Sequence, residues 1–245
     1  MKQIEVGIIN ESTKLFKRNK YRILLISIGI LVIALGLLSN FTEGYMNISL
    51  SNLPLNVLSM LNIIFIPLIC FMAVADLFAA EQENGSIKAI ITRPITRNEI
   101  LISKMLSILI YVISILTVTF IIGSIMGIVF GKTQVISIPQ IFTAYVMSIL
   151  PIIPTIFLSI LISQLSRSSS SSVMLSVLIY IIIMLITIVI PSISSMVFIS
   201  YANWYKLFIG AKMPMKSILT IIGLFLGYSL LFFSGAYALF EKREY

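Results

Sequence analysis

Long apolar stretches separated by short polar segments make up most of the chain. Six of these stretches have about the length that an α-helix needs to cross a lipid bilayer, which is roughly 20 residues. We therefore predict six membrane-spanning helices, over Ile23–Phe41, Leu53–Ala75, Met105–Phe130, Ile138–Ile162, Val173–Ile190 and Ile218–Phe240. An even number of spans places both termini on the same side of the membrane.

The composition agrees with this pattern. Of the 245 residues, 59% are hydrophobic and 11% are charged, whereas about a quarter of the residues in a soluble domain are charged. The expected fold is an all-α integral membrane protein with a single transmembrane domain over residues 1–245.

The basic residues indicate the orientation. Most of the 17 lysines and arginines fall before the first span, in the second and fourth loops, or in the C-terminal tail. Basic residues in short loops stay in the cytoplasm, so both termini are expected there. The net charge of +8 then reflects topology and contact with anionic lipid. Nucleic-acid binding is not expected, because no basic segment outside the spans is large enough to fold.

The composition also excludes several classes of active site. The chain has no histidine, one cysteine (Cys70) and one aspartate (Asp76). Zinc sites, histidine-based triads and pairs of catalytic aspartates therefore cannot form. We predict no catalytic residues, no metal ligands and no enzymatic activity of the chain itself. Cys70 lies in an apolar stretch and is expected to pack there.

Residues 1–22 are predicted to form an amphipathic helix lying along the inner leaflet. Its apolar side on a helical wheel consists of Met1, Ile4, Ile8, Ile9, Leu15 and Phe16. Its basic side consists of Lys2, Lys14, Lys17, Arg18 and Lys20.

Two segments between spans have distinctive compositions. Residues 191–217, in the last outer loop, mix aromatic residues with lysines. Because Trp and Tyr favour the membrane interface, we expect short helices there that lie on the outer leaflet or dip into it.

The serine run Ser168–Ser172 is predicted to be a flexible cytoplasmic turn. A regulatory role for this run, such as phosphorylation, stays open.

Small and polar residues within the spans point to contacts between helices. Glycines recur at every fourth position in the third and sixth spans, a spacing that lets membrane helices approach closely, within one subunit or between two. These glycines are Gly123, Gly127, Gly131, Gly223 and Gly227. Asn56 and Asn62 either line a pathway or bond a neighbouring helix.

Prolines and charges add two further expectations. Kinks are expected at the prolines in or beside the spans, which are Pro54, Pro67, Pro151 and Pro154.

Asp76 and Lys104 lie at the cytoplasmic ends of their spans, where long side chains can reach water. No span carries the buried carboxylate that a proton-coupled transporter needs, which disfavours a secondary transporter.

The segment Glu81–Lys104, EQENGSIKAIITRPITRNEILISK, is polar and rich in helix start and stop signals. The second span is expected to continue as a helix until Asn84-Gly85 breaks it. Ser86 then caps a short amphipathic helix, Ser86–Ile91, which Arg93-Pro94 ends. The sequence TRNE at 96–99 is a capping box that starts the next helix.

The order of residues in this segment resembles the cytoplasmic loop between the second and third spans of ABC-2 family permeases. The matching positions are Glu81, Glu83, Gly85-Ser86-Ile87, Pro94-Ile95-Thr96-Arg97, Ile100-Leu101 and Lys104. The N-terminal helix (an elbow helix in that family), the six spans and the hydrophobic last outer loop are also similar to that family.

The resemblance implies an ABC exporter in the bacterial plasma membrane. Two permeases, either two copies or a copy and a paralogue, would pair and bind two separate ABC ATPase subunits. Those subunits would hold ATP and Mg, and this chain would hold no cofactor. The short helix would be a coupling helix that faces the ATPase with Ile87, Ile90 and Ile91. The residues implied in ATPase coupling are Glu81, Glu83, Gly85, Ser86, Ile87, Ile90, Ile91, Arg93, Pro94 and Arg97.

The expected function is therefore that of an exporter's permease subunit. The compact chain is similar to bacterial permeases that export bacitracin, lantibiotics and other drugs, or sodium. We expect an antimicrobial peptide, a drug or another amphiphile as the substrate, as in antibiotic resistance. The alternatives are sodium or a lipid-linked substrate exported by the same machine, and a secondary transporter.

Overall fold

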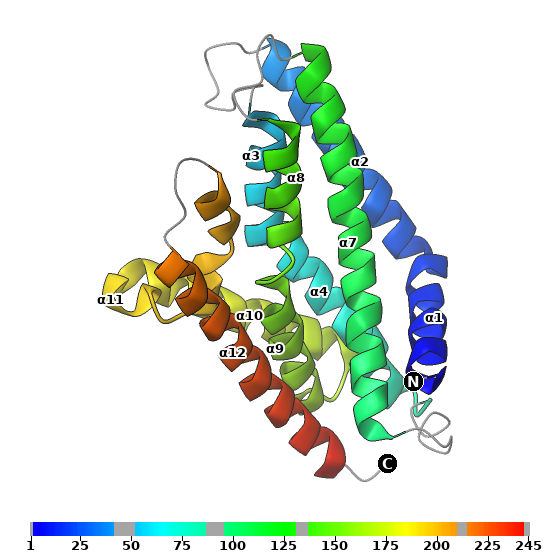
Figure 1. Cartoon of the computed structure of the whole chain (residues 1–245). Helices are drawn as coiled ribbons and strands as arrows, with labels where there is room; N and C mark the ends of the chain where they lie inside the picture. The colour runs from blue at the N-terminus through cyan, green and yellow to red at the C-terminus, as the bar shows by residue number, and fades with distance from the viewer. Residues whose placement is uncertain (1, 42–51, 87–95, 131–136, 210–214, 243–245) are drawn as a thin grey trace.

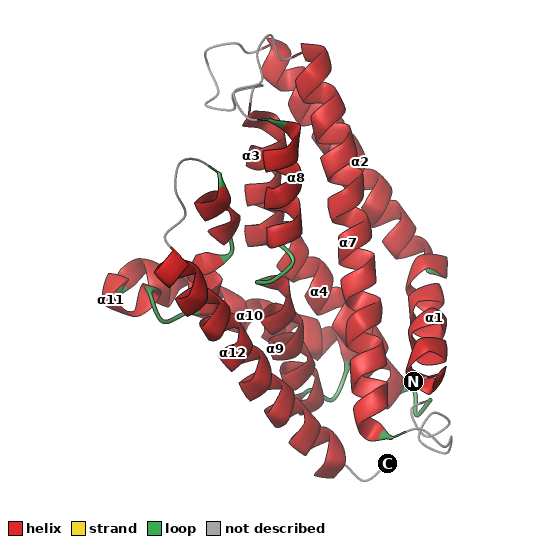
Figure 2. Ribbon diagram, in the orientation of Figure 1, coloured by secondary structure: helices red, strands yellow, loops and turns green. Residues whose placement is uncertain are grey.

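The computed structural model describes residues 2–41, 52–86, 96–130, 137–209 and 215–242, and helices make up nearly all of these ranges (Figure 2). No strand occurs in them. Within them, the helices long and apolar enough to cross a membrane are Asn19–Ser39, Leu53–Glu83, Arg97–Phe130, Ile138–Leu165, Ser169–Val189 and Met215–Lys242. The predicted all-α membrane fold with six spans is confirmed.

The described helices follow one another along the chain in this order: α1 (Lys2–Lys17), α2 (Asn19–Phe41), α3 (Leu53–Met60), α4 (Ile66–Val74), α5 (Ala80–Glu83), α7 (Arg97–Phe130), α8 (Ile138–Met147), α9 (Ile152–Leu165), α10 (Ser169–Val189), α11 (Pro191–Ser194) and α12 (Met215–Lys242). Two π-helical turns, Leu61–Phe65 and Ala75–Ala79, join α3, α4 and α5 into one continuous helix. Two 3₁₀ turns, Phe198–Tyr201 and Trp204–Phe208, follow α11.

The helices pack in two groups around the second span. On one side, the long α7 packs against α1, α2 and α3 (Figure 1). On the other, α9 packs against α4, α10 and α12. The first turn of α1 and the last turn of α12 lie at the same end of the bundle (Figure 1). We call this the termini end.

The second span is longer than its apolar stretch predicts. One helix runs from Leu53 to Glu83, well beyond the expected end of the span at Ala75. The helix ends at Asn84, and Gly85 takes a φ of 67°. Glycine adopts this left-handed conformation without a steric penalty, so the Asn84-Gly85 pair ends the helix as predicted.

The fourth span is broken, although the sequence analysis predicted one helix over Ile138–Ile162. α8 ends at Met147 and α9 begins at Ile152. Pro151 offers no N–H to the carbonyl of Met147, four residues earlier, and its ring crowds that turn of the helix. The span therefore consists of two helices joined by a turn.

The serine run starts a helix and does not form the flexible turn that was predicted. The hydroxyl of Ser168 accepts the backbone N–H of Ser171 (3.2 Å), and the hydroxyl of Ser171 accepts the backbone N–H of Ser168 (3.2 Å). Serine side chains satisfy the free N–H groups of a first helical turn in this way. α10 therefore begins at Ser169, ahead of the predicted start at Val173.

Short helices occupy the described part of residues 191–217, as predicted. These are α11 and the two 3₁₀ turns. The aromatic side chains of this segment, however, do not all face outward. Trp204 and Tyr205 are 3% and 0% exposed, so the turn Trp204–Phe208 packs into the bundle.

The N-terminal helix is shorter than predicted. α1 ends at Lys17 and α2 begins at Asn19, so residues 1–22 do not form a single helix. α1 instead meets the first span at a break around Arg18, and both helices pack on α7.

The buried side of α1 also differs from the predicted apolar side. Ser107 of α7 donates its hydroxyl to the carbonyl of Ile8 (3.1 Å). Leu15 is buried as expected, but Glu11 is buried beside it and Ile9 is 61% exposed. The side of α1 that faces α7 is therefore partly polar, because a charged partner is available there.

Aromatic side chains replace the hydrogen bonds that prolines remove. Tyr180 of α10 donates its hydroxyl to the carbonyl of Ile63 (2.9 Å), to which Pro67 offers no N–H. Trp204 donates its indole N–H to the carbonyl of Met147 (2.7 Å), at the break of the fourth span. An unpaired backbone group in a membrane costs several kcal/mol. These bonds therefore stabilise the packing of α10 and the turn Trp204–Phe208 on the kinked spans.

We predict that Tyr180→Phe lowers the free energy of unfolding by about 1 kcal/mol, because the Ile63 carbonyl loses its donor. The edge-to-face contact of this ring with Phe71 needs no hydroxyl and should remain. In a Pro67→Ala background the loss should be smaller, since alanine supplies a backbone N–H. Thermal unfolding of the parent protein, the two single variants and the double variant in detergent tests this coupling. Equal losses in both backgrounds would contradict it.

Candidate functional site

Four charged side chains from three helices meet at the termini end. Lys104 of α7 donates to Oε2 of Glu81 (2.5 Å) and to the carbonyl of Leu77 (2.5 Å). Lys14 of α1 donates to Oε1 of Glu81 (3.0 Å) and to Oε1 of Glu11 (2.8 Å). Nζ of Lys104 lies 3.8 Å from Oε2 of Glu11. We call Glu11, Lys14, Glu81 and Lys104 the ionic joint.

Most of the ionic joint is buried. Lys104, Glu11 and Glu81 are 1%, 6% and 7% exposed. This corrects the expectation that Lys104 reaches water at the end of its span. Burying a single charge is strongly unfavourable unless an opposite charge and hydrogen bonds accompany it. Two carboxylates and two ammonium groups meet that requirement here.

The contacts of Lys14 keep it charged. Burial by itself lowers the pKa of a lysine, but the hydrogen bonds and charges of Glu11 and Glu81 outweigh burial and raise the pKa of Lys14. The joint therefore links α1, α5 and α7 without adding net charge to the interior.

Asp76 makes a second connection to the N-terminal part of the chain. Its Oδ2 accepts the hydroxyl of Tyr21 (2.5 Å) and lies 3.1 Å from the guanidinium of Arg18. Lys20 also pairs with this carboxylate. Asp76 is 7% exposed, so it too is buried and paired, contrary to expectation. The second span, Leu53–Glu83, therefore does carry buried carboxylates, Asp76 and Glu81, which corrects the expectation that no span does. Tyr111 of α7 donates to the carbonyl of Tyr21 (2.8 Å), which attaches the break between α1 and α2 to the third span as well.

Glu83 and Gln82 connect the end of the second span to two other helices. Oε2 of Glu83 accepts the backbone N–H of Ser169 (2.9 Å), in the first turn of α10. A carboxylate at this place also compensates the positive end of the helix dipole. Gln82 donates its amide to Gln164, at the end of α9 (2.8 Å).

Arg97 connects the start of the third span to the end of the sixth. Its Nη1 donates to the carbonyls of Phe240 (2.8 Å) and Glu241 (2.6 Å), in the last turn of α12. The guanidinium also lies over the ring of Phe240, 5.9 Å from the centroid. The last carbonyls of a helix lack internal partners and favour a nearby cation, so Arg97 caps α12.

The predicted capping box is present. The backbone N–H of Thr96 donates to Oε2 of Glu99 (2.9 Å), and the backbone N–H of Glu99 donates to the hydroxyl of Thr96 (3.3 Å). α7 therefore starts at Arg97. This start places the guanidinium of Arg97 within reach of α12.

The remaining predicted coupling residues are only partly within the described chain. Gly85 forms the turn after the second span, and Ser86 donates its hydroxyl to the carbonyl of Glu81 (3.3 Å). The residues outside the described chain are Ile87, Ile90, Ile91, Arg93 and Pro94, with the packing glycine Gly131. The predicted coupling helix Ser86–Ile91 therefore stays a prediction.

Sequence analysis did not identify Glu11, Lys14 or Asp76 as functional. A signal for Glu11 was available, because it continues the helical series of Ile4, Ile8 and Leu15, which marks one side of α1. Its pairing with Lys14 follows the i,i+3 spacing on a helix, but no local pattern predicts the contact with Lys104, which comes from a distant part of the chain.

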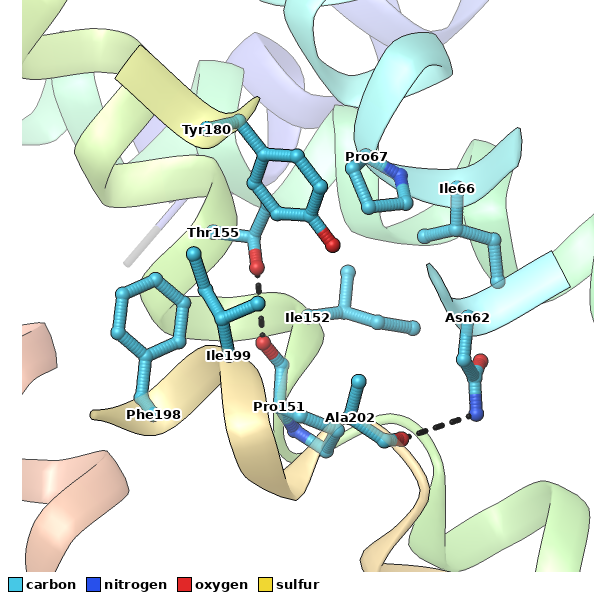
Figure 3. Close-up of a pocket in the computed structure, with 10 residues that line it drawn as sticks. All are labelled: Asn62, Ile66, Pro67, Pro151, Ile152, Thr155, Tyr180, Phe198, Ile199 and Ala202. Carbon is cyan, nitrogen blue, oxygen red and sulfur yellow. Dashed lines mark hydrogen bonds between the residues drawn. The ribbon is translucent and has the colours of Figure 1, made fainter. Parts of the chain in front are cut away.

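Asn62 and Asn56 have different surroundings. Asn62 is buried and donates its amide to the carbonyl of Ala202 (3.2 Å; Figure 3). The cavity beside it has a volume of about 10 Å³, which is room for about one water molecule. Asn62 therefore bonds a neighbouring segment in this structure. Asn56 is exposed and lines a cavity of about 370 Å³ together with Leu35 of α2, and it stays a candidate for the pathway.

The glycines of the two spans also differ. A Cβ added at Gly123 would lie 3.5 Å from Cα of Pro54, so α7 and α3 approach closely there. Gly127 is buried on the same helix. A Cβ added at Gly223 or Gly227 would have nothing within 4 Å. No described part of this chain packs on those two glycines, which leaves packing between subunits as the open alternative.

The described residues contain no group of three or more Cys, Asp or Glu side chains arranged to hold a metal ion.

The family model for the ABC-2 family transporter protein matches residues 8–184. The matched region includes the ionic joint, Asp76 and all of Glu81–Lys104. A comparison with curated proteins finds no match.

We predict that Lys104→Met lowers the free energy of unfolding by about 3–5 kcal/mol, because it leaves Glu81 buried without its nearest cation. The double variant Lys104→Met, Glu81→Gln should regain much of that loss, since neither charge remains. Glu83→Gln provides the control, because Glu83 is exposed and its change should cost less than about 1 kcal/mol. Chemical unfolding in detergent measures all three. A double variant less stable than Lys104→Met would contradict the pairing.

Proposed function

The chain belongs to the ABC-2 family of transporter proteins, and from that premise we propose that its ATPase partner moves it through residues 81–104 to drive export. Membership in the family identifies a multi-pass membrane permease of an ABC transporter, which works with ATPase subunits. In our proposal two permeases, identical or paralogous, associate with two ATPase subunits. Those subunits bind and hydrolyse ATP with Mg, and this chain supplies no catalytic residue.

The observation that carries this proposal is that both ends of the segment 81–104 are attached to other spans. At its start, Glu83 binds the first turn of α10. At its end, Arg97 binds the last turn of α12, and Lys104 pairs with Glu81 within the ionic joint. A displacement of the segment would therefore act on α1, α10 and α12 together.

The type of contact suits the transmission of force. The bonds to α10 and α12 are charge-assisted and join helix ends, where backbone groups have no partner within the helix. The Lys104–Glu81 pair of the ionic joint is buried, so water does not weaken it as it would a surface pair. A partner that pulls on residues 87–95 would act on stiff helices through these contacts.

The orientation and the substrate complete the proposal. The excess of basic residues near the termini favours a cytoplasmic termini end, where an ATPase has access to ATP, and we place the exporter in the bacterial plasma membrane. The proposed substrate is a membrane-active peptide, a drug or another amphiphile.

We predict that Ile87→Asp reduces ATP hydrolysis by the assembled complex about fivefold or more, because it places a charge on the apolar face expected to contact the ATPase. Ala89→Asp is the matched control: it adds the same charge to the opposite face of the predicted helix and should leave the rate nearly unchanged. The measurement is the ATPase rate of the co-purified complex in nanodiscs. Failure of any ATPase to co-purify, or equal rates for both variants, would contradict the proposal.

We also predict that Arg97→Gln prevents the ATPase cycle from moving α12. The neutral side chain no longer provides the cation that caps the C-terminal end of that helix. Spin labels at Ser234→Cys on α12 and Ile128→Cys on α7 report the movement. Trapping the complex with ADP and vanadate should shift their distance in the parent protein and not in Arg97→Gln. Lys242→Gln, which removes an exposed cation from the same end of α12, should retain the shift. A shift that survives Arg97→Gln would show that Arg97 does not transmit it.

A further inference from the structure

A cavity of about 550 Å³ lies between the 3₁₀ turns and the first turns of α12. Among the described residues, its wall carries one cation, Lys206, and hydroxyl groups that include those of Ser200 and Ser217. The apolar side chains that line it include the partly exposed Tyr201 and Leu207 and the buried Trp204 and Ile221. The cavity thus combines a charged and hydrogen-bonding part with an apolar part.

The charge of Lys206 is not neutralised by the described chain. Lys206 is exposed and belongs to none of the ion pairs among the described residues. The acidic residues of the described chain lie on α1, at the end of the second span, in the first turn of α7 and in the last turn of α12. The cavity adjoins the opposite end of α12, so the charge that the described residues place beside it is positive.

The polar groups around Lys206 are suited to an anion. Ser200 and Ser217 are exposed, and neither hydroxyl forms a hydrogen bond with another described residue. Hydroxyl groups and an ammonium group donate hydrogen bonds to the oxygens of a phosphate or a carboxylate. The indole N–H of Trp204 is already bound to Met147, which fixes the ring as a wall of the cavity.

We propose that this cavity binds an amphiphile with an anionic headgroup, such as an alkyl phosphate or an alkyl carboxylate. Lys206 pairs with the headgroup, the two serines donate to its oxygens, and the chain of the ligand lies against Tyr201 and Leu207, beside the buried Trp204. The inference narrows the substrate class and, as a transport site, rests on the proposed export function. Binding itself needs no ATPase, so it is tested separately from coupling.

The single tryptophan of the chain makes the test direct, because Trp204 lines the cavity. The purified protein in neutral maltoside micelles is titrated with brominated dodecyl phosphate, whose bromines quench indole fluorescence at short range. Brominated dodecylphosphocholine, with the same chain and a zwitterionic headgroup, is the comparison probe. We expect saturable quenching by the phosphate probe at concentrations where the phosphocholine probe quenches weakly.

Variants assign the effect to Lys206. K206Q should weaken binding of the phosphate probe about three- to tenfold and remove most of its dependence on ionic strength. K206R keeps the cation and should restore most of the affinity. K216Q is the matched control, because Lys216 lies in the first turn of α12 but does not line the cavity. Unchanged binding in K206Q, or equal loss in K216Q, would overturn the assignment.

A final comparison distinguishes the sources of the ligand. In nanodiscs containing brominated phosphatidylglycerol, quenching that unbrominated dodecyl phosphate reverses indicates a bound membrane lipid at the same site. Quenching by the soluble phosphate probe without quenching by the lipid indicates an amphiphile from the aqueous phase. Both results support an anionic headgroup at Lys206. Equal quenching by the phosphate and phosphocholine probes would refute the proposal, even if the Ile87→Asp experiment supports coupling.

Discussion

A backbone carbonyl inside a membrane has no water to bind when a proline removes its helical partner. Pro67 and Pro151 create this situation in the second and fourth spans. Tyr180 donates to the carbonyl of Ile63, and Trp204 donates to that of Met147, which also accepts a longer bond from the backbone N–H of Leu150 (3.4 Å). The position of α10 and of the 3₁₀ turns before α12 is therefore tied to where the spans kink. Asn62 adds a third bond to the same turns, at Ala202.

At the termini end, the buried charge of Lys104 likewise needs a partner from another helix. Lys104 has almost no exposed surface and would be strongly destabilising without Glu81. The ionic joint supplies that carboxylate and adds Glu11 and Lys14 from α1, so the N-terminal helix packs on the second and third spans. In the proposed exporter this arrangement has a functional consequence. The segment that receives force from the ATPase begins and ends at residues that bind other helices, namely Glu81, Glu83, Arg97 and Lys104.

Local signals in the sequence predicted the features whose partners lie within a few residues. Asn84-Gly85 ends the second span, and Thr96 and Glu99 cap α7, as expected. The serine run was misread because its composition is typical of linkers, whereas one serine at the correct position is enough to cap α10. The break after Met147 was only partly foreseen. Prolines predict a kink, but whether the helix continues depends on which donors reach the freed carbonyls.

The candidate site shows the same difference between features that local sequence predicts and features that depend on distant residues. Glu81, Glu83 and Arg97 stood out in the sequence because they flank a polar turn between two spans. Their partners did not, since Lys14, Ser169 and the last carbonyls of α12 approach only when the bundle forms. Apolar length, basic-residue distribution and turn signals thus determined the membrane fold, the number of spans and the segment of interest. Only the tertiary structure decided which charges are buried and which helix ends are joined. Those contacts link residues far apart in the chain, and no spacing along the sequence encodes them.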